Sequence, residues 1–310
     1  MSINGLGREE VNIAGGNRDL TGHALLSHAH HRNPAFRRIL LVANELGSVP
    51  AAFHTAFALV DRVEGEVVLL EAPSRVPRGT ASAGQANWTN QASNIDFLEI
   101  RRSSLDAAFI DKIAQEYQCD LVILMMENRD NKQRMVRGCL AEETFRRISC
   151  PTLVLGPRAA CFPFTGSDAG PILFATSFQD RNLAAISVAS KAASQFGRPL
   201  ECVHVLPANL ETPTHERHII PQILRDALLA GARHNHVPIK PDQCHILYAG
   251  SVSDALVQFA TLRKACLIVL GVQQRGPVVS YLPEGIAPSV IRFAPCPVLM
   301  LASPGQRDMH

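Results

Sequence analysis

Cysteine and histidine are the residue types in this chain with the most scope for chemistry, and Cys139 is the strongest candidate among them. It follows Gly138 at the expected first turn of a helix, and Arg134 and Arg137 stand shortly before it. A helix N-terminus and neighbouring cations lower the pKa of a thiol and make it more reactive. Cys139 is therefore a candidate redox sensor. The competing interpretation, which we favour, is a small inert residue that fills space beneath a loop.

Two groups of histidines have the residue type of a metal site but not its spacing. His28, His30 and His31 lie together near the N-terminus, and His215 and His218 stand three residues apart. Transition-metal sites need further ligands at a suitable spacing, and neither group supplies one. We therefore interpret these side chains as solvated histidines and expect no metal.

The remaining reactive residues show no catalytic arrangement. Serine, histidine and acidic residues form no nucleophile elbow, so the sequence gives no support to hydrolase chemistry. The pairs Cys119 with Cys150 and Cys266 with Cys296 stand at the starts of neighbouring expected strands. Such positions favour reduced, buried thiols in a reducing compartment. We expect a protein that is not an enzyme.

The elements that would position these residues form a repeat. Apolar runs at 37–44 and 170–177 lack period-two alternation and are typical of buried parallel strands. Near the end of each half a Cys-Pro pair opens another apolar run, at 149–157 and 295–303. The distance from the preceding apolar strand to this Cys-Pro is 29 residues in both halves. This regular spacing indicates two copies of one domain.

The rest of each half alternates helices with strands. The first half is predicted to contain helices at 48–64, 104–117 and 138–148 and strands at 66–72, 95–101, 120–126 and 152–156. The second half is predicted to contain helices at 180–196, 215–235, 252–264 and 285–293 and strands at 200–206, 243–249, 266–271 and 297–302. Such alternation is typical of an open parallel sheet with helices on both faces, whose ligands bind beyond the carboxyl ends of the strands.

The two halves differ in the middle. The second half has apolar residues at helical spacing in 215–235, whereas its counterpart in the first half, 73–94, is rich in Ser, Gly, Asn and Pro. We expect 73–94 to be a surface loop that replaces a helix.

Composition and charge exclude several classes of protein. Hydrophobic residues make up 46% of the 310 residues and the formal net charge is +2, which is typical of an ordinary globular protein. No strong field favours nucleic acid or a membrane surface. The first twenty residues lack the pattern of a signal peptide, and no later run is long and apolar enough to span a membrane. We expect a cytoplasmic protein that binds neither nucleic acid nor membrane.

The chain resembles the universal stress protein family in the order of its elements. A first strand is followed by an apolar strand, a glycine-containing loop, a helix and a strand that opens with Ala-Pro-Cys-Pro-Val-Leu at 294–299. The resemblance implies an α/β fold with two tandem Rossmann-like domains of the adenine nucleotide alpha hydrolase type. Each domain would be a five-stranded parallel sheet, and the two separate sheets would pack about a pseudo-twofold axis as an internal pseudo-dimer. The expected parts are an arm at 1–35, domains at 36–158 and 171–304, a linker at 159–170 and a tail at 305–310.

Members of this family that bind ATP carry an aspartate at the end of the first strand and a G-x2-G-x9-G-[ST] loop after the fourth. Glycines let backbone N–H groups approach phosphates. In the first half the matching residues are Asn44 for the aspartate, then Met125, Asn128, Gly138 and Cys139 for the loop. Only Gly138 keeps the pattern, so we expect this site to be closed.

The second half departs from the pattern at different positions. The matching residues are Ser177 for the aspartate and Gly271, Gln274, Glu284 and Gly285 for the loop, with Arg275 and Gly276 beside them. A carboxylate at Glu284 would repel triphosphate oxygens. We expect no cofactor other than weakly bound ATP at this degenerate site.

The resemblance implies a non-catalytic protein of the stress response that acts through a protein partner or a small ligand. A first alternative is an adenine-nucleotide-binding switch or weak ATPase that works through the second domain. A second alternative is the redox sensor at Cys139. The sequence is compatible with an internal pseudo-dimer alone and with a further homodimer of the whole chain.

Overall fold

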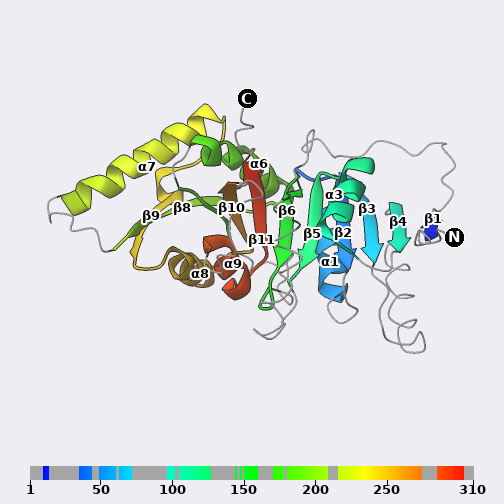
Figure 1. Ribbon diagram of the computed structural model, residues 1–310. Helices are drawn as coiled ribbons and strands as arrows, with labels where there is room; N and C mark the ends of the chain where they lie inside the picture. The colour runs from blue at the N-terminus through cyan, green and yellow to red at the C-terminus, as the bar shows by residue number, and fades with distance from the viewer. Residues whose placement is uncertain are drawn as a thin grey trace, which may run out of the picture.

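The computed structural model describes residues 10–13, 35–43, 49–60, 63–71, 96–101, 105–126, 144, 147, 148, 150–159, 170–177, 180–208, 216–273 and 285–303. Several expected segments fall mainly or wholly outside these residues: the loop 73–94, most of the helix 138–148, most of the linker 159–170 and the tail 305–310. The described residues form a sheet of eleven strands with helices on both faces (Figure 1).

The first half contributes six strands and two described helices. In chain order they are β1 (Glu10–Ile13), β2 (Arg38–Ala43), α1 (Val49–Val60), β3 (Glu66–Glu71), β4 (Asp96–Arg101), α3 (Ala107–Glu116), β5 (Leu121–Met125) and β6 (Thr152–Leu155). The second half contributes β7 (Ile172–Ala175), α6 (Asp180–Phe196), β8 (Leu200–Pro207), α7 (Glu216–His234), η2 (Pro241–Gln243), β9 (Cys244–Ala249), α8 (Val252–Leu262), β10 (Leu267–Gln273), α9 (Ile286–Phe293) and β11 (Val298–Ser303).

Each half contains the expected five-stranded parallel sheet. The order is β4-β3-β2-β5-β6 in the first half and β9-β8-β7-β10-β11 in the second, with parallel pairing throughout both sets. Counting the five strands of each half in chain order, both orders read three, two, one, four, five. The predicted α/β fold class is therefore confirmed, and the repeat seen in the sequence is a repeat of topology.

The expectation of two separate sheets was wrong, because β6 and β11 pair and make the sheet continuous. These two strands are antiparallel, with Leu153 opposite Leu299 and Val154 opposite Val298. Leu153 and Leu299 occupy the same position in the repeat, three residues after Cys150 and Cys296. The edge strand of each half is short and apolar, and such an edge offers unpaired backbone groups to a second edge. Side-chain patterns do not show whether an edge is covered by a helix or by another strand.

The N-terminal arm also differs from the expectation, since it contains a strand. β1 pairs antiparallel with β4 and places Val11 opposite Ile100. Four residues are too few for the alternation of apolar and polar side chains to predict a strand. The first half therefore has six strands, and β4 is covered at its outer edge.

Two apolar cores lie on opposite faces of the sheet. Ile39 and Leu41 of β2 pack with α1 in one core, whereas Leu40 and Val42 pack with α3 in the other. The first core continues to α6 and α7, and the second to α8 and α9. Both cores cross the β6–β11 junction, as expected for strands that are buried on both faces.

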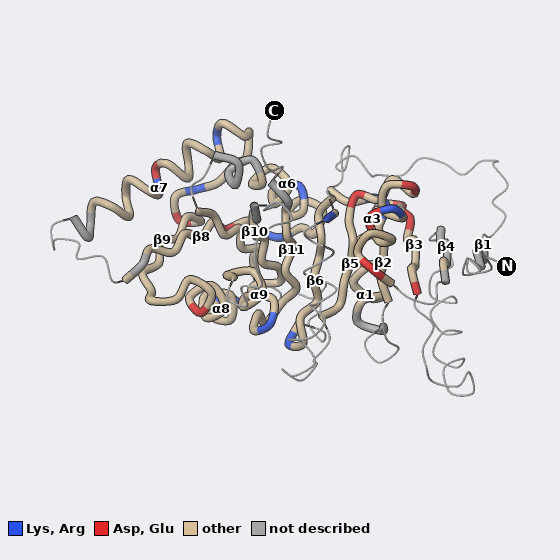
Figure 2. Tube along the Cα trace, in the orientation of Figure 1, with Lys and Arg blue, Asp and Glu red and all other residues tan. Residues whose placement is uncertain are grey.

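Charged residues are absent from the strands in the middle of this buried sheet. The five central strands β5, β6, β11, β10 and β7 contain no charged residue. Elsewhere the basic and acidic residues are interspersed over both halves (Figure 2). None of the helices in the described part of the chain has the length and apolar character that crossing a membrane requires.

A buried glutamine joins the two halves. The side chain of Gln195 on α6 is 2% exposed and accepts hydrogen bonds from the backbone N–H of Ala35 (2.9 Å) and Phe36 (3.1 Å). Its amide donates to the carbonyl oxygens of Phe36 and Leu59, each at 3.1 Å. α6 of the second half therefore holds the entry to β2 and the end of α1.

Candidate functional site

The candidate ligand site lies where β7 and β10 run side by side. Ala175 pairs with Leu270, so the carboxyl ends of these two strands are adjacent. The chain leaves β7 for α6 on one face of the sheet and leaves β10 for α9 on the other. A crevice forms at such a point because the two connections diverge, and ligands of open α/β sheets bind there.

Two residues named from the sequence lie at this end of the two strands. Ser177 lies two residues beyond the end of β7 and is exposed, and Gly271 follows Leu270 in β10 and is half-buried. The expected strand ended at Gly271, but β10 continues to Gln273, which pairs with Ser303 of β11. Gly271 therefore lies within the strand and does not begin a loop.

Gly285 is the N-cap of α9. Its backbone is extended (φ −77°, ψ 150°), and it offers no side chain to cap the helix. An added Cβ would lie 3.2 Å from Cδ of Pro288, so this position suits glycine. The backbone N–H groups of the first turn of a helix attract anions. The second half thus presents a helix N-terminus without an acidic cap.

The structure adds His204 to this edge of the sheet. Nδ1 of His204, on β8, lies 2.7 Å from the carbonyl oxygen of Thr176, which follows β7. Burial lowers the pKa of His204, and the neutral ring donates through Nδ1 to this carbonyl. This histidine was not predicted from the sequence. Its only signal was a polar residue near the carboxyl end of a mostly apolar strand.

The other proposed site residues lie outside the described residues. In the second half these are Gln274, Arg275, Gly276 and Glu284, and in the first half Asn44, Asn128, Gly138 and Cys139. The structure does not test their roles.

Met125 is the one residue of the first-half pattern that the structure describes. It ends β5, pairs with Leu155 and packs its side chain against the first apolar core. Where ATP-binding relatives are expected to have glycine, this half has a packed thioether side chain.

Metal ligation finds no further support. Within the described ranges no group of three histidine, cysteine, aspartate or glutamate residues is placed to hold a metal ion. His28, His30, His31 and His215 lie outside those ranges, and the side chain of His218 is not described.

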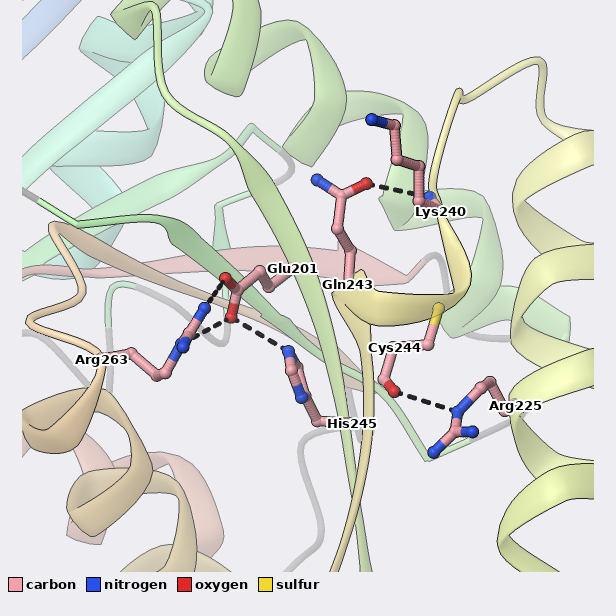
Figure 3. Close-up of polar contacts among 7 residues, drawn as sticks. All are labelled: Glu201, Arg225, Lys240, Gln243, Cys244, His245 and Arg263. Carbon is pink, nitrogen blue, oxygen red and sulfur yellow. Dashed lines mark hydrogen bonds and ion pairs between the residues drawn. The ribbon is translucent and has the colours of Figure 1, made fainter.

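A second polar cluster lies near the other end of the strands (Figure 3). Glu201, the second residue of β8, is 5% exposed. It accepts hydrogen bonds from Nε (3.1 Å) and Nη2 of Arg263, and Nε2 of His245 lies 3.1 Å from its Oε2.

The environment of this cluster indicates a structural role. Burial lowers the pKa of His245, although Glu201 opposes this shift, and its ring packs against Phe259 of α8. The hydrogen bond to Glu201 raises the pKa of Arg263. The cluster ties the residue after α8 to β8 and β9, away from the edge where ligands of this fold bind.

Comparison with known proteins identifies the second half of the chain. Residues 169–302 match the model of the universal stress protein family. No curated protein matches the sequence.

Solved structures share the fold over both halves. A functionally unknown protein from Pseudomonas aeruginosa PAO1 is 21% identical and has a TM-score of 0.62, with 87% of this chain and 93% of that chain covered. A universal stress protein from Archaeoglobus fulgidus DSM 4304 is 14% identical and has a TM-score of 0.56, with 89% of this chain and 98% of that chain covered. Residues 169–302 therefore form a universal stress protein domain, within a chain whose two halves share one topology.

Proposed function

We propose that this protein is a non-catalytic protein of the stress response whose second domain receives a small ligand at the carboxyl ends of β7 and β10. The observation that carries the proposal is the pairing of Ala175 with Leu270, which places Ser177 and Gly271 at the same end of two neighbouring strands, at the point where the strand order reverses. The family match of residues 169–302 supports a role in stress. The residues named at this edge can offer hydrogen bonds to a small ligand.

The same residues argue that ATP binds weakly at this edge. An aspartate after the first strand accepts hydrogen bonds from ribose hydroxyls, and an exposed serine, Ser177, stands in its place. Glu284, just before the N-cap of α9, adds a negative charge where phosphates would approach the helix. We therefore propose a ligand less anionic than a triphosphate, and no obligatory cofactor.

In the first half, the packed side chain of Met125 argues for a closed site. The two halves then act as one unit, an internal pseudo-dimer joined at β6 and β11, in which only the second half binds a ligand. We place this protein in the cytoplasm, where it would act through a small ligand or an unidentified protein partner.

Calorimetry with Mg-ATP tests this assignment. The unmodified protein is expected to bind with a dissociation constant no tighter than about 100 μM, which corresponds to about 5.5 kcal/mol. Ser177→Asp is expected to tighten binding roughly fivefold, because a charge-assisted hydrogen bond contributes about 1 kcal/mol more than a neutral one. Glu284→Gly is expected to tighten it as well, because the repelling carboxylate is removed.

The matched control is Asn44→Asp, which places the same carboxylate in the first half. We expect no gain there, because Met125 places a side chain, packed against the first apolar core, where the binding pattern has glycine. Micromolar binding by the unmodified protein, or ATP that stays bound through purification, would contradict the proposal and favour a nucleotide-binding switch. ATP hydrolysis that Ser177→Asp increases would favour a weak ATPase.

A further inference from the structure

Two cysteines lie directly opposite each other on neighbouring strands of the second domain. Cys202 on β8 pairs with Cys244 on β9 in the parallel register of these strands. Both side chains point into the first apolar core, where they are 0% and 3% exposed. Their sulfurs are in hydrogen-bond contact.

We propose that Cys202 and Cys244 form a redox site that a hydroperoxide oxidises reversibly to a disulfide. This site lies outside the candidate ligand site and does not depend on the proposed function. It also differs from the sensor considered at Cys139, because both of its sulfurs are placed by neighbouring strands of the sheet.

Cys244 differs chemically from the other buried cysteines. Burial raises the pKa of Cys119 and Cys150 to about 12 and that of Cys266 to about 11. The pKa of Cys244 is instead lowered, first by the hydrogen bond from Cys202 and also by the charge of Arg225, although burial and the charge of Asp242 oppose the shift. The thiolate is the nucleophile in thiol oxidation. Cys244 is therefore the residue of this pair that attacks a peroxide.

Arg225 is held in place to exert this effect. It extends from α7, and its Nε donates a hydrogen bond to the carbonyl oxygen of Cys244 at 3.3 Å (Figure 3). A fixed guanidinium group beside a cysteine stabilises the thiolate, because an opposite charge favours the ionised form.

The position of β9 gives a small oxidant access to this buried pair. Among the described strands β9 is the last of the sheet and pairs only with β8. After Cys244 its residues are half-buried or exposed. Edge strands with few buried contacts open locally at a low free-energy cost, whereas central strands open only when the whole domain unfolds. Peroxide therefore reaches Cys244 during brief opening of β9.

The chemistry needs one hydroperoxide and no other reactant. The Cys244 thiolate attacks the O–O bond, which breaks. One oxygen stays on sulfur as a sulfenic acid, and the other takes up a proton and leaves as water from hydrogen peroxide, or as an alcohol from an organic hydroperoxide. The Cys202 thiolate then attacks the sulfenic sulfur, and the displaced hydroxide takes up a proton and leaves as water. The two thiols lose two electrons in total, and the peroxide gains them.

The sheet geometry explains why this disulfide would be reversible. Neighbouring strands lie about 4.8 Å apart, which is within the Cα separation of about 4.4–6.8 Å that a disulfide requires. Disulfides are most often found at a Cα separation of about 5.5–6 Å, so a bond formed at this closer strand spacing would be under some strain. Strained disulfides are more readily reduced.

To test the proposal, hydrogen peroxide is added to the full-length protein in modest molar excess. The protein is then unfolded in the presence of an alkylating agent, which blocks the remaining thiols, and is digested with trypsin. Cys202 and Cys244 fall on different tryptic peptides, 192–217 and 234–263. The expected result is a cross-link between these peptides that a dithiol reductant removes, with loss of two alkylatable thiols. In Cys202→Ala, dimedone should instead trap a sulfenic acid on Cys244.

Cys266 and Cys296 provide the matched internal control. Both are buried at the starts of the neighbouring strands β10 and β11, in the centre of the sheet, and burial raises both pKa values. They should remain alkylatable under the same treatment. The proposal is overturned if Cys202 and Cys244 stay reduced in the native protein, or if the central pair cross-links as readily.

Discussion

At the residue scale, His204 and His245 are expected to make the stability of the second domain depend on pH. They lie half-buried on the neighbouring strands β8 and β9, and burial lowers the pKa of both below the ordinary value of about 6.5. The unfolded chain therefore binds protons at these residues more readily than the folded protein does. Stability from this source is fully present above pH 6.5 and is lost as the pH falls through the folded pKa values.

We expect the free energy of unfolding to be lower at pH 5.5 than at pH 7.5, as urea denaturation at the two values would measure. The double variant His204→Gln/His245→Gln should show a smaller difference, because glutamine does not titrate while it keeps an N–H donor. An equal difference in both proteins would show that other groups account for the pH dependence.

At the element scale, Gln195 shows how one side chain fixes the position of a helix. It lies on α6 of the second half, and its hydrogen bonds satisfy backbone groups at the entry to β2 and at the end of α1 in the first half. Leucine has a similar volume but can make none of these bonds. Buried backbone groups without partners cost about 1–3 kcal/mol each.

Gln195→Leu is therefore expected to lower the free energy of unfolding by about 3 kcal/mol, because several backbone groups lose their partner at once. The control is Gln115→Leu on α3, an exposed glutamine whose amide donates to Asp111 at 2.8 Å. Its loss should cost less than about 0.5 kcal/mol, since surface substitutions have small effects. Similar denaturation midpoints for both variants would contradict the role of Gln195.

The elements themselves were largely predictable from the sequence. The helix expected at 180–196 coincides with α6, and most other boundaries agree within a few residues, because apolar periodicity is a local signal. Gln195 and the Cys202–Cys244 pair were not predictable, because their partners lie far away in the sequence. Of the candidate site, Ser177 and Gly271 were named by their match to the family's nucleotide-binding pattern, whereas His204 required the register of β7 and β8.

At the scale of the whole molecule, the β6–β11 junction determines how the two halves associate. Equivalent residues, Leu153 and Leu299, lie opposite each other in this antiparallel pair. A contact in which each copy uses the same surface is the kind that two identical subunits form about a twofold axis. The repeat predicted that the halves are related, but the pairing of two edges depends on backbone groups, which the sequence pattern does not reveal.

This geometry predicts that a fragment of residues 169–304 forms a homodimer. Without β6 the edge of β11 is uncovered, and a second β11 fits it in the same antiparallel register, with Leu299 opposite Leu299. Sedimentation velocity should therefore find the fragment as a dimer at micromolar concentration. Leu299→Lys should convert it to a monomer, because two buried ammonium groups would meet at the axis, and circular dichroism would verify that the variant folds. A fragment that is folded and monomeric before any substitution would show that the junction depends on contacts from elsewhere in the chain, such as those of Gln195.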